Sequence, residues 1–408
     1  VMMAPYWLEW LELLLRWLHL LVGVAWIGAS LHFVLVDRSL ISDPEDDAVK
    51  GRFWAIHGGG VYQFTKYNLA PPEWPATLHW SKWEAYTTWL TGMGLLTLIY
   101  YLRSDAYLVG VEKWVTEPSQ AIWVSLGLIA SSLALYEGLI RSPLARRTAL
   151  FAALITVLVL ILCWLSAQLL SNRAAFIHVG VILGSIMVGN VFFGIIPAQK
   201  AFVAAVQAGR DPDLALTLAA RHRSFFNNYL TMPVLFCMVS LHFPLLYQHS
   251  LNFLGLFLVM FAGALARHFF NLRHLDILRW RYLWIAAGLI ALTMLLLRPP
   301  VLDDINAPSA LSATVESIEP ALTKVEIDGL MMTHCANCHS ASPTHPGFAT
   351  APGGLYFVDQ EDLLRQKARA ASAIGSGYMP LGNMTKLSRA ERARLMRYLI
   401  TSEAKGGA

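Results

Sequence analysis

The sequence predicts an all-α protein, in which a polytopic membrane helix bundle of about eight transmembrane helices is followed by a small helical domain. Hydrophobic residues make up 56% of the 408 positions and charged residues only 14%, which is far from the balance of soluble proteins. Long apolar runs recur up to residue 298, whereas the last part of the chain is mostly polar. The chain therefore divides into a membrane domain (1–298), a linker (299–319) and a C-terminal domain (320–408).

Eight apolar runs come close to the length of about twenty residues that crosses roughly 30 Å of hydrocarbon. They cover residues 17–36, 85–102, 121–140, 150–170, 175–196, 225–247, 253–266 and 282–297. The seventh run is short, and Gly92 and Gly94 interrupt the second. Arg298-Pro299-Pro300 then ends the membrane domain, and a stretch with several Ser, Ala and Pro residues predicts the linker.

The distribution of positive charge predicts how the bundle is oriented, because Lys and Arg collect in cytoplasmic loops. The loops after the first, third, fifth and seventh runs hold sixteen Lys or Arg residues, and the other loops hold three, namely Arg103, Lys113 and Arg173. Both termini and the C-terminal domain are thus expected in the periplasm, on the outer side of a bacterial inner membrane. Lipid is then a partner, while a net charge of +4 without a long basic run excludes nucleic acid.

Cys335-Ala336-Asn337-Cys338-His339 has the spacing of a covalent haem attachment site. The two cysteines can form thioethers to one haem while His339 binds the iron. A zinc site would need a second ligand pair at similar spacing, and a thiol redox pair would need a βαβ surround. The sequence shows neither pattern, so it predicts one haem c.

The second axial ligand of that iron is expected further along the chain. Met379 lies in a glycine-rich loop that can present its sulfur to the iron, and Met384 is the rival. Ser388 and Glu391 then form a capping box that opens a closing helix. This order of helix, attachment motif, Met loop and closing helix resembles a class I cytochrome c over residues 320–402.

Three histidines are predicted near the periplasmic ends of the spans: His19, His178 and His242. Ionisable groups inside membranes are costly and are therefore functional candidates. Neutral imidazoles from facing helices can hold a b-type haem in a bundle, so this set could bind a haem b close to haem c. The alternative is that the three are interfacial histidines bonded to neighbours or water.

The long loop between the first two spans contains chemistry suited to a planar anion. It holds His57, three consecutive glycines (Gly58 to Gly60), Tyr62, Lys66, Lys82 and Glu84. Glycine lets the backbone approach a ligand closely, Lys can hold an anion, and aromatic rings can stack on a flat ligand. Equally, such aromatic residues serve as membrane-interface anchors and such lysines follow the orientation rule.

Two adjacent amides, Asn227 and Asn228, begin the sixth span shortly before Pro233. Amides could read the donors and acceptors of a heterocycle. They could also satisfy backbone groups that a proline kink sets free.

Several motifs together resemble the membrane-bound urate hydroxylases of the PuuD type. They are Gly58-Gly59-Gly60 with Tyr62, Lys66-Tyr67, Ala70-Pro71, Leu78-His79-Trp80, Lys82-Trp83-Glu84-Ala85-Tyr86, Asn227-Asn228-Tyr229 and the fused attachment motif. The resemblance implies oxidation of urate to 5-hydroxyisourate, with electrons leaving through haem c to a respiratory acceptor such as a soluble cytochrome c or a terminal oxidase. His57 or Glu84 could act as the base. The first span, with Trp17-Leu18-His19, is also similar to b-haem membrane proteins such as the HemJ type, which favours His19 as a haem ligand.

Two other hypotheses about the function stay open: a cytochrome that relays electrons from a separate dehydrogenase, and a haem-processing membrane protein. Urate bound at the cytoplasmic loop would lie roughly 30 Å from a periplasmic haem, too far for a single electron transfer. Either a haem b lies between the two, or the substrate site is nearer the periplasmic face than the glycines suggest.

Overall fold

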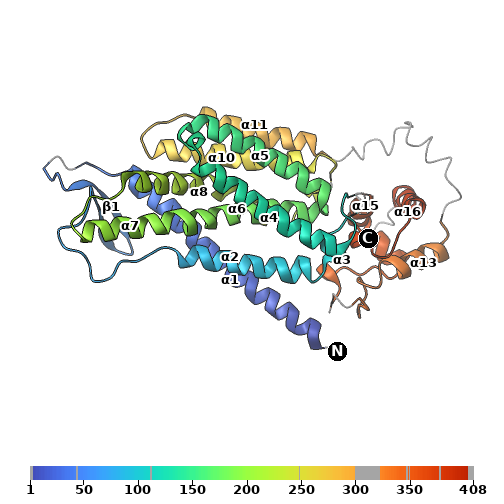
Figure 1. Cartoon of the computed structure of the whole chain (residues 1–408). Coiled ribbons are helices and arrows are strands. Elements are labelled where there is room, and N and C mark those ends of the chain that lie inside the picture. Colours follow the sequence, from blue (N-terminus) through green and yellow to red (C-terminus); the bar gives the residue numbers. More distant parts are fainter. Residues whose placement is uncertain are drawn as a thin grey trace.

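The computed structural model describes residues 3–42, 45–110, 113–247, 249–298, 322–345, 348, 350–375 and 378–402. A long helical bundle carries a small C-terminal domain of short helices at one end (Figure 1). The N-terminus lies toward the same end as this domain. The predicted linker, residues 299–319, lies outside the described residues.

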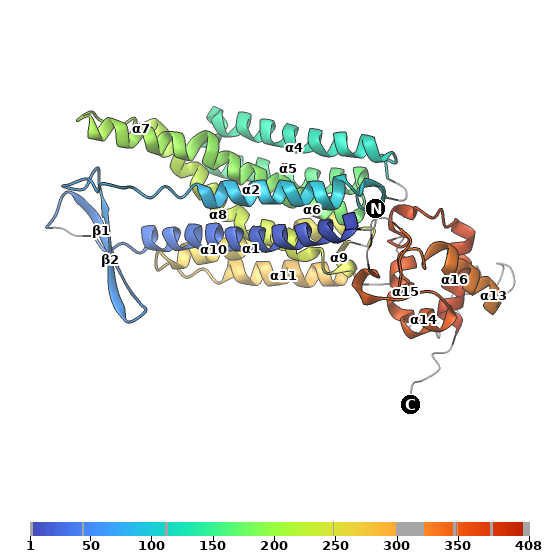
Figure 2. The same ribbon diagram turned by 90° about the horizontal axis from the view of Figure 1, so that it is seen from below.

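The bundle helices run nearly parallel to one long axis (Figure 2). They are α1 (Met3–Arg38), α2 (Trp83–Leu96), α4 (Pro118–Arg141), α5 (Thr148–Leu169), α6 (Asn172–Gly189), α7 (Ile196–Gln207), α8 (Leu214–Ser240), α10 (Asn252–Arg273) and α11 (Arg281–Leu296). Short segments join them: α3 (Ser104–Tyr107), η2 (Pro143–Arg146) and α9 (Pro244–Tyr247). We call the two ends of the bundle the hairpin end, where a β-hairpin projects, and the C-domain end.

Within the described residues, five helical stretches are long and apolar enough to cross a membrane. They are Tyr6–Arg38, Pro118–Arg141, Thr148–Leu169, Asn172–Gln207 and Asn252–Arg273, and Arg281–Leu296 is a shorter apolar helix. All eight runs expected from the sequence fall on helical parts of the bundle. The count of eight crossings stays a prediction, because the remaining helices are shorter or more polar.

The all-α expectation is wrong for the long loop after α1. Residues Val49–His57 (β1) and Gly60–Tyr67 (β2) form an antiparallel hairpin in which His57 pairs with Gly60. Gly58 and Gly59 have φ values of 57° and 80°. A two-residue connection with both φ values positive is the tight turn that matches strand twist, and glycine adopts it without strain. The glycine run is therefore explained by the hairpin turn.

Two π-helical turns interrupt the bundle helices, η1 (Thr97–Tyr101) after α2 and η3 (Asn190–Ile195) between α6 and α7. Such turns are rare and often mark functional sites. At η3 the helix makes room for a neighbouring side chain: a Cβ added to Gly194 would lie 2.2 Å from Cδ of Arg223. Glycine is thus required for α8 to pack against this turn.

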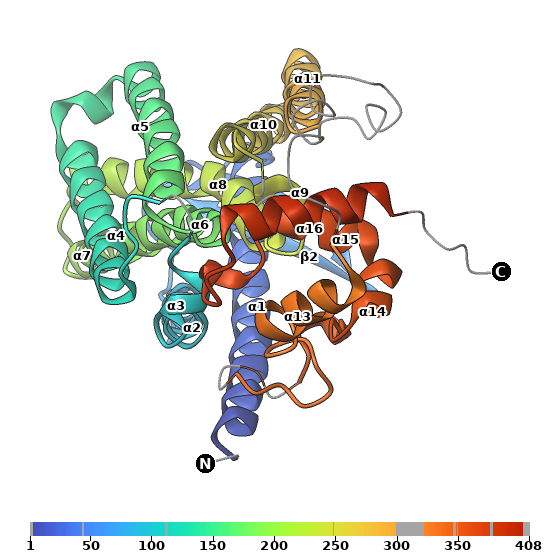
Figure 3. The same ribbon diagram turned by 90° about the vertical axis from the view of Figure 1, so that its right-hand side faces the viewer.

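The C-terminal domain packs four helices around its own core (Figure 3). They are α13 (Lys324–His334), α14 (Gln360–Arg365), α15 (Lys367–Gly375) and α16 (Arg389–Thr401), with short turns η5 (Pro352–Gly354) and η6 (Leu381–Asn383). The predicted capping box of Ser388 and Glu391 is confirmed at the start of α16. Leu395 and Leu399 of that helix are fully buried, as its amphipathic pattern predicts.

Residues 378–384 of the C-terminal domain pack against the bundle. The rings of Tyr378 and Tyr247 lie 5.6 Å apart, centre to centre. Leu381 and Met384 pack against the buried core of the bundle. Because α15 and α16 flank this segment, one loop touches both parts of the protein.

Candidate functional site

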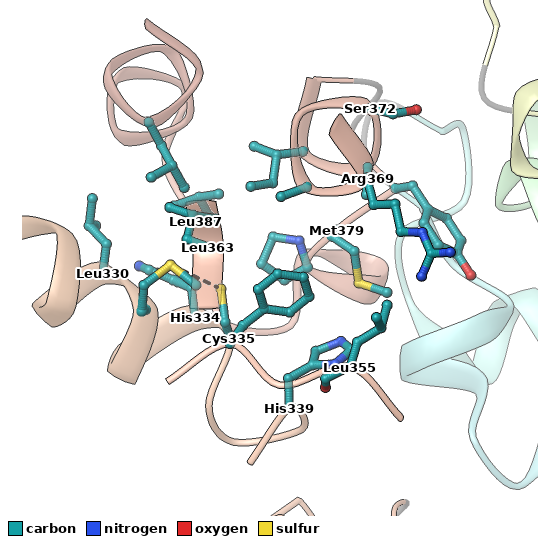
Figure 4. A pocket seen from close by; sticks show the side chains of 18 of the residues that line it. Leu330, His334, Cys335, His339, Leu355, Leu363, Arg369, Ser372, Met379 and Leu387 are labelled. Carbon is teal, nitrogen blue, oxygen red and sulfur yellow. Dashed lines mark hydrogen bonds between the residues drawn. The ribbon is translucent and has the colours of Figure 1, made fainter. Parts of the chain in front are cut away.

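A cavity of about 510 Å³ lies inside the C-terminal domain. This volume falls within the range of about 300–1,000 Å³ that is usual for cofactor sites. Its walls are mostly aliphatic and aromatic, and they include Cys335, His339 and Met379 (Figure 4). The attachment motif and the loop methionine, 44 positions apart by number (379 − 335), are thus brought to one cavity.

The attachment motif is placed by the helix that precedes it. Thr323 and Glu326 form a capping box that opens α13, and the helix ends at Cys335. The backbone N–H groups of Cys338 and His339 both donate to the Cys335 carbonyl oxygen, at 3.1 and 2.9 Å, which folds the motif into one turn. Burial raises the pKa of the Cys335 thiol to about 12, and the neighbouring Cys338 adds to this shift.

His339 is oriented by the strand-like stretch that follows the motif. Its Nδ1–H donates to the Leu355 carbonyl oxygen at 2.9 Å, and its ring packs edge-on against Phe357. That hydrogen bond fixes the tautomer and leaves Nε2 as the metal-binding nitrogen. Burial also lowers the pKa of His339, which keeps the imidazole neutral and able to bind a metal.

The two candidate methionines have different surroundings. Met379 lines the cavity, on the side that faces His339 in Figure 4. The guanidinium of Arg392 holds its backbone by donating from Nη1 to the Met379 carbonyl oxygen at 2.7 Å. Met384 packs instead against the core of the bundle. Of the two, Met379 is the one that could supply a sulfur to an iron in the cavity.

These residues fit a haem c. The cavity supplies a cysteine of the attachment motif, a histidine with a free Nε2, a thioether sulfur and an apolar lining, which are the donors and the surroundings that such a group requires. Arg369 also lines the cavity, and its guanidinium could pair with a haem carboxylate. Sequence reasoning missed Arg369 because nothing in its local pattern separates it from a surface arginine.

The three candidate haem b ligands are not brought to one site. His178 is fully buried, with Nδ1 bonded to the Ala174 carbonyl oxygen at 2.7 Å and Nε2 bonded to Ser125 Oγ at 2.6 Å. His19 packs on α2, with Nδ1 3.0 Å from the Thr88 carbonyl oxygen. His242 is exposed. Because both ring nitrogens of His178 are engaged, His178 in this arrangement does not fit a haem b ligand.

The residues proposed for substrate binding near the glycines lie on or beside the hairpin. His57 and Tyr62 are exposed, and Lys66 forms an ion pair with Asp37. These side chains therefore lie on an exposed part of the hairpin.

Lys82 and Glu84 lie at the start of α2. The ammonium of Lys82 lies over the Trp83 ring at 5.5 Å. Glu84 Oε1 is 3.6 Å from His79 Nε2, and its Oε2 is buried without a hydrogen-bond partner among the described residues. Glu84 is the more buried of the two proposed bases.

Asn227 belongs to a buried polar network in the bundle. Asn190 donates to Asn227 Oδ1 at 2.8 Å, and Asn227 donates to the Met187 carbonyl oxygen at 2.9 Å. Arg223 donates to Asn190 Oδ1 at 2.9 Å and pairs with both carboxylate oxygens of Glu137 at 2.7 and 2.8 Å. Asn227 thus has partners inside the bundle, and they are side-chain and backbone groups of α6 and η3, not backbone groups freed by Pro233.

Asn228 belongs to a second buried network. Its Oδ1 accepts from Arg267 Nε at 2.6 Å, and its Nδ2 donates to Asn271 Oδ1 at 3.0 Å. Arg38 donates to the Asn271 carbonyl oxygen at 2.7 Å. Arg223 and Arg267, which the sequence assigned to loops, are therefore buried inside the bundle, at 6% exposure each. Their positions within long helices were the signal that could have revealed them.

The fold and these sites define a helical protein with several helices able to cross a membrane and a cofactor-sized cavity in a separate terminal domain. The model of the family described as urate oxidase N-terminal matches residues 5–298, which is most of the chain. The chain belongs to this family. No curated protein and no solved structure matches it.

Proposed function

We propose that the protein oxidises urate to 5-hydroxyisourate and passes the electrons through a haem c to a respiratory acceptor, such as a soluble cytochrome c or a terminal oxidase. The observation that supports this most is the family match over residues 5–298, in one chain with a cavity lined by Cys335, His339 and Met379. The family match supports urate as the substrate, and the cavity supports a haem as the acceptor of its electrons. The C-terminal domain is then a cytochrome c domain.

The reaction balances as urate plus water giving 5-hydroxyisourate, two protons and two electrons. A haem held in this cavity would accept one electron at a time. The residues of the bundle must therefore hold the purine in place while two electrons and two protons leave it. The absence of dioxygen from this balance separates the proposal from oxidases that reduce oxygen directly.

The residues of the C-terminal domain prepare the cavity for this role. Leu355 fixes the tautomer of His339, and Arg392 fixes the backbone at Met379. The apolar lining excludes water, which stabilises the reduced, less charged state of a bound iron and, with Met ligation, raises its potential. A higher potential suits an acceptor of electrons from an organic substrate.

We further propose that the bundle lies in a bacterial inner membrane with both termini and the cytochrome c domain in the periplasm. The charge asymmetry supports this even after the buried Arg223 and Arg267 are set aside, because fourteen (16 − 2) loop cations then remain against three. Attachment of a c-type haem outside the cytoplasmic membrane agrees with this orientation.

The test is a spectrum of the purified protein under anaerobic conditions. Addition of urate alone should convert the oxidised haem bands to the reduced bands, and the pyridine spectrum should show haem c without haem b. If urate leaves the haem oxidised while a partner dehydrogenase or a porphyrin precursor reduces it, the proposal is wrong and a relay or haem-processing role replaces it.

A further inference from the structure

An unpaired cation lies where the bundle meets the C-terminal domain. Arg173, in the first turn of α6, interacts electrostatically with four tyrosines: Tyr100, Tyr107, Tyr247 and Tyr378. Its guanidinium carbon lies over the Tyr107 ring at 5.1 Å. No carboxylate in the described part of the chain forms an ion pair with it.

The local chain holds this arginine in place. Ser171 caps α6 by accepting from the Ala174 N–H at 3.2 Å, and its own hydroxyl donates to the Tyr107 carbonyl oxygen at 2.5 Å. The Ser171 N–H donates to the Leu108 carbonyl oxygen at 2.8 Å. These bonds join the start of α6 to the end of α3, which sets the Tyr107 ring against the guanidinium.

Two polar atoms of this cluster are buried without any hydrogen-bond partner in the described residues, Arg173 Nε and the Tyr100 hydroxyl. Tyr100 is only 2% exposed, so water does not reach its hydroxyl from bulk solvent. Its neighbour Tyr101 differs, since that hydroxyl is bonded to Ser125 at 2.8 Å. Buried polar groups are almost always hydrogen-bonded. Because Arg173 Nε and the Tyr100 hydroxyl both lack a partner, they indicate that an acceptor is missing from this cluster.

The cluster is also next to the cavity of the C-terminal domain. Tyr378 lines that cavity, and its ring lies 5.6 Å from that of Tyr247. Tyr378 directly precedes Met379. Tyr378 therefore lies between the cluster around Arg173 and the cavity.

We propose that Arg173, Tyr100, Tyr107 and Tyr247 form the urate site of this protein. The identity of the anion rests on the proposed function, whereas the site rests on the geometry. Arg173 Nε donates to an oxygen of the anion, the Tyr100 hydroxyl bonds to a polar edge of the purine, and the tyrosine rings pack against its face. Binding here removes the need for electrons to cross the bilayer.

The network of Arg267 is the rival location, because Arg267 Nη2 and Asn271 Nδ2 are also buried and unpartnered in the described residues. Two observations make this network the weaker candidate for the urate site. Arg267 already donates to Asn228, so its guanidinium is partly satisfied. Arg38 joins this network from the end of α1 that leads into the hairpin, so the network lies toward the far end of the bundle from the cavity.

The test measures urate binding separately from turnover. Full-length protein is reduced with dithionite, so that it cannot take electrons from urate, and the dissociation constant for urate is measured by equilibrium dialysis. Arg173→Met should raise this constant roughly 10- to 100-fold, as expected for the loss of a charge-assisted hydrogen bond in a buried site, and Tyr100→Phe should raise it several-fold. Arg173→Lys should give an intermediate value and guards against a folding defect.

Matched controls come from the adjacent residues. Arg103→Met removes a cation that is already paired with Glu12 at 3.4 Å, and Tyr101→Phe removes the hydroxyl bonded to Ser125. Both should bind urate as the unaltered protein does. A neutral, fully N-methylated purine should bind equally weakly to the unaltered protein and to Arg173→Met.

The outcomes separate the site from the function. Unchanged urate binding in Arg173→Met, loss of binding only in Arg267→Met, or no binding to the unaltered protein would overturn the site. Binding that depends on Arg173, in a protein whose oxidised haem urate does not reduce, would leave the site standing and overturn the proposed function.

Discussion

Replacing Glu137 by Gln should destabilise the bundle strongly, because it leaves a buried cation without a counter-charge. Arg223 has a side chain only 7% exposed and donates to both carboxylate oxygens of Glu137. Removing one partner of a buried ion pair costs about 3–5 kcal/mol, whereas removing an exposed partner costs about 0–1 kcal/mol. Arg141, which also pairs with Glu137 but is 62% exposed, supplies the matched control, Arg141→Gln.

The two free cysteines of the bundle, Cys163 and Cys237, make the assay possible. Both are buried, so a thiol-reactive dye reports unfolding of the bundle in detergent as the temperature rises. At roughly 2–4 °C per kcal/mol, Glu137→Gln should lower the apparent Tm by about 6–20 °C and Arg141→Gln by no more than about 4 °C. Equal shifts in the two variants would refute the claim that burial of Arg223 makes its pairing with Glu137 matter.

Three further outcomes are expected. Met379→Ala should abolish the charge-transfer absorption of a Met-ligated ferric haem while Met384→Ala keeps it, and the reverse result would make Met384 the ligand. Gly59→Ala places a side chain at a residue with φ 80°, and the resulting strain of about 1–2 kcal/mol should lower the apparent Tm. Urate-driven reduction of the haem should be unchanged in this variant. If that reduction is lost, the substrate site belongs at the hairpin. The pKa of Glu326 is lowered to about 2, mainly by the hydrogen bond from the Thr323 backbone N–H and next by the hydrogen bond from the Arg394 side chain. This carboxylate thus stabilises the C-terminal domain above its unfolded pKa of about 4.3, and the contribution is lost as pH falls toward about 2. Thermal unfolding followed by haem absorption should show that loss in the unaltered protein, and a smaller dependence on pH over this range in Glu326→Gln.

Features that depend on neighbours in sequence were predictable. The capping box of Ser388 and Glu391 was confirmed, because it needs only two side chains three residues apart. The helical character of all eight apolar runs followed from composition and length. The meeting of Cys335, His339 and Met379 at one cavity agrees with the order of elements expected after the attachment motif.

Features that depend on pairing across the fold were not predictable. The hairpin was missed because its glycines were interpreted as space for a ligand, while their role is to turn the chain. The pairing of Glu137 with Arg223 joins residues 86 positions apart, and no periodicity encodes it. Arg173 was counted only as a loop charge, since its electrostatic interaction with four tyrosines from distant segments becomes visible only in the folded chain.

The segment from Tyr378 to Met384 has a consequence for the autonomy of the C-terminal domain. One face of this segment presents Met379 to the cavity, and the other places Leu381 and Met384 on the bundle. Cutting the chain in the linker would expose those apolar residues and free one side of the loop that carries Met379. A domain boundary drawn from composition therefore does not mark an independent module, and an excised C-terminal domain is expected to hold Met379 in place less firmly than the intact chain.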